Sequence, residues 1–120
     1  MGERLMKKGI TKKQNPLEKL KIIAEKLKVP YAIHQYDGDE KEFCVYEVNC
    51  FDPELFADNR AQSYTASAQL HYIMPAGVGF FQKSDEIAKL LMDSGFTAPR
   101  VLIEHQEKRT ILQFTTEINL

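Results

Sequence analysis

Apolar side chains recur at three- and four-residue spacing in two stretches of the chain, a pattern typical of helices that cover a core with one face. The first stretch follows Asn15, a good N-cap residue, and stops before Pro30. The second begins at Phe80 or at Ser84 and ends before Gly95, a natural residue just past a helix end. The apolar positions are Leu17, Leu20, Ile23, Ala24 and Leu27 in the first stretch, and Ile87, Leu90 and Leu91 in the second.

Strict alternation of apolar and polar residues marks a long strand over residues 63–74, with one dry face and one wetter face. Strand formers also gather at 31–36, 42–50, 100–106 and 110–118. A polar turn between the first two of these segments predicts a hairpin, and a short turn between the last two predicts another. Within the strands, Cys44, Tyr46, Val48 and Cys50 are expected on one face, and Leu112, Phe114, Thr116 and Ile118 on the inner face of the last strand.

The predicted order is therefore α-β-β-β-α-β-β. Short turns between neighbouring strands favour a mainly antiparallel sheet of four to five strands, and two helices cover one face of it most economically. We expect a two-layer α+β sandwich formed by a single domain over residues 15–120. Residues 1–14 are polar and basic, without period, and are interpreted as a flexible basic arm. Residues 51–62 are interpreted as a long loop, and the segment from Pro75 to Phe81 as a break before the second helix.

The composition narrows the class of protein. A chain of 120 residues fits one domain, and it contains no apolar run long enough to span a bilayer and no secretory signal pattern, so no membrane partner and a cytosolic location are expected. The net charge of -1 hides a split. Residues 1–28 carry nine basic and three acidic side chains, whereas 29–120 carry seven and fourteen. No aromatic residues interleave with the basic ones, so no nucleic-acid specificity is predicted.

No pattern of reactive side chains points to catalysis, to a cofactor or to a metal. His34, His71 and His105 fall in three different predicted strands without ligand spacing, and His105 is expected to be half-buried. Cys44 lies between apolar neighbours, which favours a core cysteine, and Cys50 is too far along the same strand to pair with it. Neither a calcium loop nor a phosphate loop is present, because the acidic turn of Asp37, Asp39, Glu40 and Glu42 and the glycines 77 and 79 lack the required spacing.

Apolar side chains on the two predicted loops are the best candidates for contact with a partner, since aromatic residues are favoured in interfaces. The alternative is that each loop folds back over its own core. The candidate interface residues are Leu55, Phe56, Asp58, Asn59, Arg60, Val78, Phe80 and Phe81.

The chain resembles small tail-region structural proteins of long-tailed phages and prophages of Gram-positive bacteria, of the tail terminator or tail completion type. The resemblance covers most of residues 16–118 and rests on residues 29–34 (VPYAIH), the strand core Phe43–Tyr46, residues 56–60 (FADNR) before a long alternating strand, and a helix followed by a C-terminal hairpin. The sequence departs from the family pattern at Pro75–Phe81, where relatives tend to have a short charged link.

The resemblance implies a structural role without catalytic groups. Similar proteins form rings, often hexamers, that cap the tail tube and help join the head, so the implied partners are further copies, the tail tube protein and head–tail connector proteins. The implied location is the host cytoplasm during assembly and then the virion tail or neck. A head–tail connector or stopper is an alternative within the same class. A cytosolic binding module or small enzyme that uses the sheet face is the alternative outside it.

Overall fold

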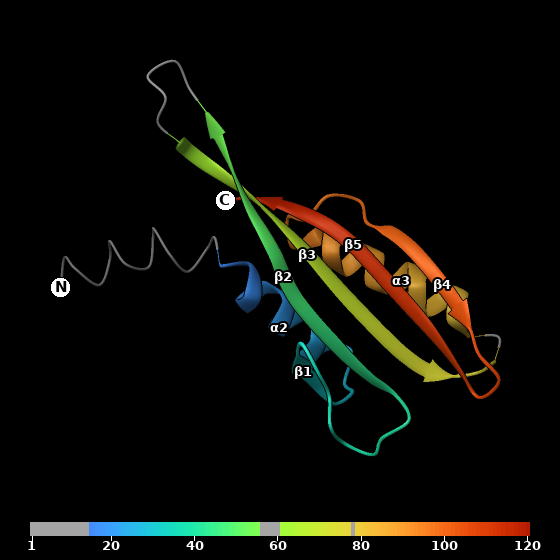
Figure 1. The fold of residues 1–120 in the computed structure, drawn as a ribbon. Helices are drawn as coiled ribbons and strands as arrows, with labels where there is room; N and C mark the ends of the chain where they lie inside the picture. The colour runs from blue at the N-terminus through green and yellow to red at the C-terminus, as the bar shows by residue number, and fades with distance from the viewer. Residues whose placement is uncertain (1–14, 56–60, 78) are drawn as a thin grey trace.

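The computed structural model describes residues 15–55, 61–77 and 79–120, in which two helices pack on a five-stranded sheet (Figure 1). The predicted α+β class and the order α-β-β-β-α-β-β are confirmed. The sheet order is β1-β2-β3-β5-β4, and all neighbours except β1 and β2 are antiparallel. The elements are α2 (Pro16–Lys26), β1 (Tyr31–Ile33), β2 (Phe43–Leu55), β3 (Ala61–Pro75), α3 (Phe80–Asp93), β4 (Arg100–His105) and β5 (Arg109–Asn119).

The helix boundaries follow from local hydrogen bonds. The Asn15 side chain accepts hydrogen bonds from the amides of Leu17 and Glu18, at 3.0 and 3.2 Å, and so caps α2. α3 begins at Phe80, the earlier of the two predicted starts, after Gly79, which offers no side-chain cap. Its end is confirmed at Gly95, whose φ of 100° is cheap only for glycine. The amide of the next residue, Phe96, donates to the Leu91 carbonyl at 3.0 Å, which closes the last turn.

Both helices lie on the same face of the sheet and bury the alternating residues that the sequence assigned to the dry face. The even-numbered residues from 66 to 74 in β3 and from 110 to 118 in β5 are buried as predicted, and one cluster of buried apolar side chains joins these strands to both helices. The opposite face of the sheet, hereafter the open face, carries no helix in the described chain. The core includes Leu20, Ile23, Ala24, Cys44, Tyr46, Ala68, Leu70, Tyr72, Ile87, Leu91, Leu112, Phe114 and Ile118.

The predicted hairpin between residues 31–36 and 42–50 is wrong. β1 is only three residues long and runs parallel to β2, with Tyr31 opposite Cys44. His34 ends β1 because its φ of 71° is incompatible with an extended strand. Residues 34–42 then carry the chain back along the sheet before β2 begins, so the polar segment serves as a return connection.

The predicted loop over residues 51–62 is also wrong where the chain is described. β2 continues to Leu55 and β3 begins at Ala61. Pro53 does not end β2, because proline is tolerated in a strand whose other edge is unpaired, and β1 pairs with β2 only as far as Tyr46. A bulge at Asn49 shifts the register, so Cys50 lies opposite Ser67 and is exposed. The expectation that Cys50 shares a face with Cys44 was therefore wrong.

The two described helices are too short to cross a bilayer, and neither is apolar enough to do so.

Candidate assembly surfaces

The far end of the β2–β3 hairpin projects from the molecule. β5 pairs with β3 only as far as Thr65, and the Leu120 amide still donates to the Tyr64 carbonyl at 2.7 Å, so β2 and β3 continue as a two-stranded ribbon only beyond the Pro53–Tyr64 pair. Residues 51–55 and 61–64, which include this ribbon and its base, are here called the outer hairpin. Figure 1 shows this ribbon running beyond β5 and beyond both helices. Phe51 and Tyr64 lie at the base of the ribbon, on the helix-side face of the outer hairpin, and are 54% and 43% exposed. The apolar stripe of the core thus continues onto the outer hairpin without the cover that the helices give elsewhere.

The other end of the hairpin carries a pocket of about 280 Å³ on the open face, here called the basic pocket. Phe43 of β2 and Ile73 of β3, which are register partners, form its apolar floor. The 34–42 connection borders one side and the turn between β4 and β5 the other. The lining residues are Glu40, Lys41, Phe43, Ile73, Lys108 and Arg109.

Several contacts fix the walls of the basic pocket before any ligand binds. The Tyr36 ring stacks on Phe43 with centroids 4.5 Å apart, and its hydroxyl donates a hydrogen bond to the Glu40 carboxylate. This hydrogen bond lowers the pKa of Glu40, so the carboxylate stays ionised. On the other side, Arg109 Nε donates to Gln106 Oε1 at 2.7 Å, and the Lys108 carbonyl accepts from Ala76 at 3.2 Å.

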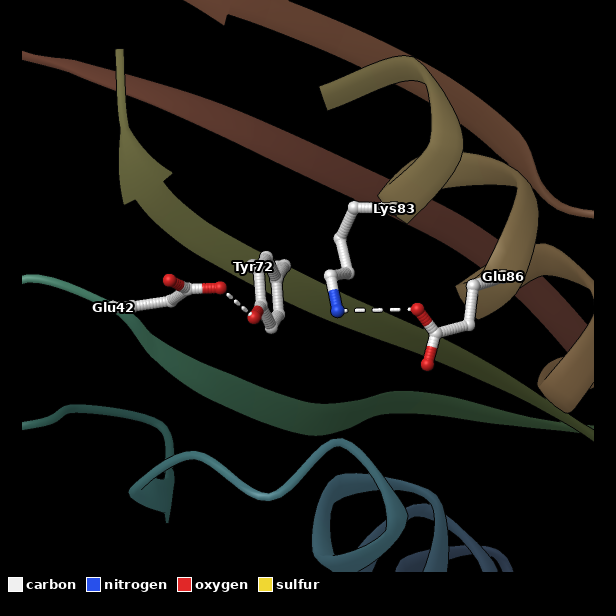
Figure 2. A network of polar contacts seen from close by, with 4 residues as sticks. All are labelled: Glu42, Tyr72, Lys83 and Glu86. Carbon is white, nitrogen blue, oxygen red and sulfur yellow. Dashed lines mark hydrogen bonds and ion pairs between the residues drawn. The ribbon is translucent and has the colours of Figure 1, made fainter. Parts of the chain in front are cut away.

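A polar network closes the core beside the start of β2 (Figure 2). The ring of Tyr72 is fully buried, and its hydroxyl donates a hydrogen bond to the Glu42 carboxylate. Lys83 lies 5.5 Å above the ring and pairs with Glu86 at 3.1 Å. Burial, and then the hydrogen bond to Glu42, raise the pKa of Tyr72 far above its usual value, so the hydroxyl remains a donor. The network holds the 34–42 connection onto the sheet. Glu42, which was predicted to belong to an acidic turn, is instead half-buried against Tyr72.

Few of the predicted interface residues can be placed. Phe56, Asp58, Asn59, Arg60 and Val78 lie outside the described residues, and Leu55 is the last residue of β2. Phe80 and Phe81 lie in α3, whereas the sequence placed them on a loop. Phe80 is half-buried against the core and meets His105 edge-on, with ring centroids 4.8 Å apart. Phe81, by contrast, is 72% exposed and remains a candidate for contact.

The histidines and cysteines do not come together in a reactive cluster. Within residues 15–55, 61–77 and 79–120, no three His, Cys, Asp or Glu side chains are placed to hold a metal ion. His34 lies outside any strand and His105 is exposed, which corrects the two expectations for these residues. Cys44 is fully buried, which confirms the predicted core cysteine, and desolvation raises the pKa of its thiol to about 12. His34 and His71 share a hollow of only about 40 Å³ with Glu47.

Sequence reasoning missed both surfaces for the same reason. Phe51 and Tyr64 were assigned to a loop and to a core face, because a periodic pattern shows which residues share a face but not how far the covering helices reach. The basic pocket combines residues from three separate segments, and only the three-dimensional register brings Lys41 to Lys108. The sequence contains one weak indication of the basic pocket, because Lys108 and Arg109 are adjacent basic residues in an otherwise acidic part of the chain.

No protein-family model matches this chain, and no curated protein matches it.

Proposed function

We propose that this chain is a structural protein of the tail or head–tail junction of a phage or prophage, and specifically a tail terminator that caps the tail tube as a ring. The resemblance over residues 16–118 supplies the class of protein. The observation that carries self-assembly is the outer hairpin, which ends in a two-stranded ribbon and leaves Phe51 and Tyr64 exposed at the base of that ribbon. An isolated two-stranded ribbon is marginally stable in water, so a partner surface that covers it is favoured.

Ring formation requires a contact between two different surfaces of the same chain, repeated around a closing rotation. The outer hairpin and the opposite end of the sheet differ in shape and in charge, which suits such a head-to-tail contact. The partners of this role are further copies of the chain, the tail tube protein and the head–tail connector proteins. The protein would assemble in the host cytoplasm and remain in the virion tail or neck. Such a role requires binding surfaces and no catalytic group.

The mass of the full chain in solution tests this proposal, by native mass spectrometry and by sedimentation velocity over a range of concentrations. We expect a ring-sized oligomer for the natural sequence and a folded monomer for the double variant Phe51→Ser with Tyr64→Ser. The matched control is Ile22→Ser, which changes a similarly exposed apolar residue on α2 and should leave the oligomer intact. A natural chain that stays monomeric at every concentration contradicts the proposal.

A second measurement separates a terminator from a connector or stopper. The assembled chain is added to tail tube protein during polymerisation, and tube lengths are measured by electron microscopy. A terminator binds tube ends and shortens the tubes, whereas a connector of the head side leaves their length unchanged.

A binding module that uses the sheet face is the second candidate, and the basic pocket is the observation that favours it. Its volume of about 280 Å³ lies just below the range of roughly 300–1,000 Å³ that small-molecule sites occupy. The pocket therefore suits a side chain from another protein better than a cofactor.

A further inference from the structure

β4 forms one edge of the sheet, and its outer side pairs with no other strand among the described residues. This edge carries three consecutive apolar residues, of which Leu102 and Ile103 are 47% and 41% exposed. Monomeric proteins normally protect an edge strand with an inward-pointing charge, a proline or a bulge. None of these interrupts residues 101–103, whose register with β5 is regular, so the edge is open to a further strand.

The register shows which backbone groups of β4 point to this edge. In an antiparallel pair, opposite residues alternate between those that exchange hydrogen bonds and those that do not. The Gln106 amide donates to the Arg109 carbonyl at 2.8 Å, so these two residues form a bonded pair. The even-numbered residues of β4 therefore bond to β5, and the amides and carbonyls of Val101 and Ile103 point to the outer edge.

The sequence of β4 is complementary to itself when two copies run antiparallel. In the register centred on Leu102, this residue lies opposite its counterpart in the second copy, and Val101 lies opposite Ile103. One position further out, Arg100 lies opposite Glu104, on the open face, and two-fold symmetry repeats both pairs. Opposite residues of an antiparallel pair share a face, so these side chains can meet directly. Arg100 has no ion-pair partner in the part of the chain that the structure describes.

We propose that β4 of one copy pairs antiparallel with β4 of a second copy about a two-fold axis at Leu102, so that the two five-stranded sheets become continuous. The backbone fits this register, because Val101 and Ile103 then exchange about four hydrogen bonds across the axis. A shift by one residue sets edge-facing groups against groups already bonded to β5. A shift by two sets Leu102 against a charged side chain, Arg100 or Glu104. This inference goes beyond the ring proposed above, which uses the outer hairpin.

α3 presents a second exposed apolar surface on the same side of the molecule. It lies behind β4 and β5 in Figure 1 and runs along them. Its Phe80 contacts the end of β4, whereas Lys83 lies over β3. The helix surface therefore turns towards β4 from Lys83 to Phe80, and Phe81 and Met92 come next in the same direction. These two side chains are 72% and 44% exposed and project on the β4 side of the helix.

The two-fold axis brings these apolar side chains of the two copies together. Phe80 lies against His105, and Leu102 is about 10 Å back along the strand. The same length of helix is roughly seven residues, which puts the middle of α3 beside Leu102. An axis at Leu102 therefore passes near the middle of both α3 helices and sets Phe81 of one copy beside Met92 of the other. Methionine sulfur and aromatic rings attract each other, so the helices support the strand pairing.

The size of this contact limits its strength. Small interfaces associate weakly, so one pair should dissociate at the micromolar concentrations at which the double variant Phe51→Ser with Tyr64→Ser, here called the hairpin variant, is a monomer. A ring presents one β4 edge for each copy, and two rings can therefore join through several contacts at once, which strengthens their association.

Charge reversal in the hairpin variant isolates the β4 contact from the ring. At about 0.1 mM or above, where weak contacts are populated, we expect the hairpin variant to form dimers in sedimentation velocity. Adding Arg100→Glu sets like charges opposite each other and should raise the dissociation constant about tenfold or more. Adding Glu104→Arg as well restores opposite charges and should recover most of the association. The matched control is Lys89→Glu, an equal change of charge at an exposed position of α3.

Arg100 and Glu104 are exposed, so these variants should fold, which circular dichroism checks. A hairpin variant that stays monomeric up to about 1 mM, or a charge swap that restores nothing, overturns the inference and leaves the ring untouched. Loss of the rings themselves in the otherwise natural chain with Arg100→Glu also overturns it, because β4 would then be the ring contact. A natural chain that forms this dimer but no ring supports the inference and contradicts the proposed function.

A single introduced cysteine tests the register. The axis makes Leu102 its own neighbour in a non-bonded pair, with Cα atoms about 4.5 Å apart, which a disulfide can span. In a chain whose exposed Cys50 is replaced by alanine, Leu102→Cys should therefore form a disulfide-linked dimer under mild oxidation. The matched control is the similarly exposed Ile103→Cys, whose two thiols would be displaced by about 7 Å along the strands and should not link. Linkage through position 103, or equal linkage in both variants, overturns the register.

Discussion

The inner and outer parts of the β2–β3 hairpin share one pattern and differ in what covers them. In the inner part, Leu70, Tyr72 and Cys44 are 0% exposed beneath the two helices. In the outer part, Phe51 and Tyr64 occupy equivalent positions on the same face yet are 54% and 43% exposed. Alternation therefore specifies which face is apolar, and a second layer decides whether that face is buried.

The structural cause of the difference is length. β3 extends over 15 residues, but its partner β5 and the helices reach only its inner part. Protein surfaces normally bury large contiguous apolar areas against other elements, so an uncovered continuation of a core stripe favours a role outside the monomer. If the outer hairpin is an assembly surface, changes in the inner part should alter the stability of the fold, and changes in the outer part should alter association.

The largest expected effect comes from truncating one residue of each part in the same strand. Leu70→Ala should lower the free energy of unfolding by about 2–5 kcal/mol, because it removes a fully buried side chain and leaves a cavity. Tyr64→Ala, in the outer part, should change it by roughly 0.5 kcal/mol or less. Urea denaturation followed by circular dichroism, at a concentration low enough to keep the chain monomeric, measures both values.

Equal losses of stability in the two variants would show that the outer hairpin contributes to the monomer core. The inner and outer parts would then not differ in their role. A second core position on β5, Phe114→Ala, serves as the positive control, since its ring is also fully buried. Its loss should match or exceed that of Leu70→Ala.

A smaller effect is expected from the hydroxyl that anchors the inner part. Tyr72→Phe removes the hydrogen bond to the half-buried Glu42, which should cost about 1–3 kcal/mol. Tyr36→Phe removes the corresponding hydrogen bond to the exposed Glu40 and should cost much less, because water can replace it. Thermal and urea unfolding compare the two variants with the natural chain. Similar costs in both would mean that burial does not strengthen the Tyr72 contact.

Sequence reasoning succeeded where local periodicity decides the structure, and it failed where the pairing of distant strands decides it. The core stripes of α2, β3 and β5 were predictable, because a residue such as Leu70 or Phe114 belongs to a long period set by local backbone geometry. The parallel β1, the extension of β2 through Pro53 and the bulge at Asn49 were not, since each depends on which edge is paired. The basic pocket depends on register between distant segments, and no local pattern encodes the approach of Lys41 to Lys108.

The two cysteines give the last and smallest contrast, because Cys44 lies in the inner part of the hairpin and Cys50 directly precedes the outer hairpin. Burial raises the pKa of Cys44 from 9.0 to about 12, whereas the hydrogen bond to Asp52, and only then desolvation, raise the pKa of Cys50. A pKa that is higher in the folded chain than in the unfolded chain stabilises the fold fully below the unfolded value, and this contribution is lost as pH rises. The contribution of Cys44 should therefore decline as the pH rises from about 9 towards 12.

We expect the free energy of unfolding to fall less steeply over this pH range in Cys44→Ala than in the natural chain. The comparison uses the slope with pH, since the cavity left by the substitution also lowers stability at neutral pH. Cys50→Ala is the matched control, and its slope should differ less from that of the natural chain than the slope of Cys44→Ala does, because Cys50 is exposed and solvent screens its charge. Labelling by an aromatic disulfide reagent checks the exposure itself. Cys50 should react in the folded chain and Cys44 only after unfolding. Rapid reaction of both thiols in the folded chain would contradict the burial of Cys44 beneath the helices.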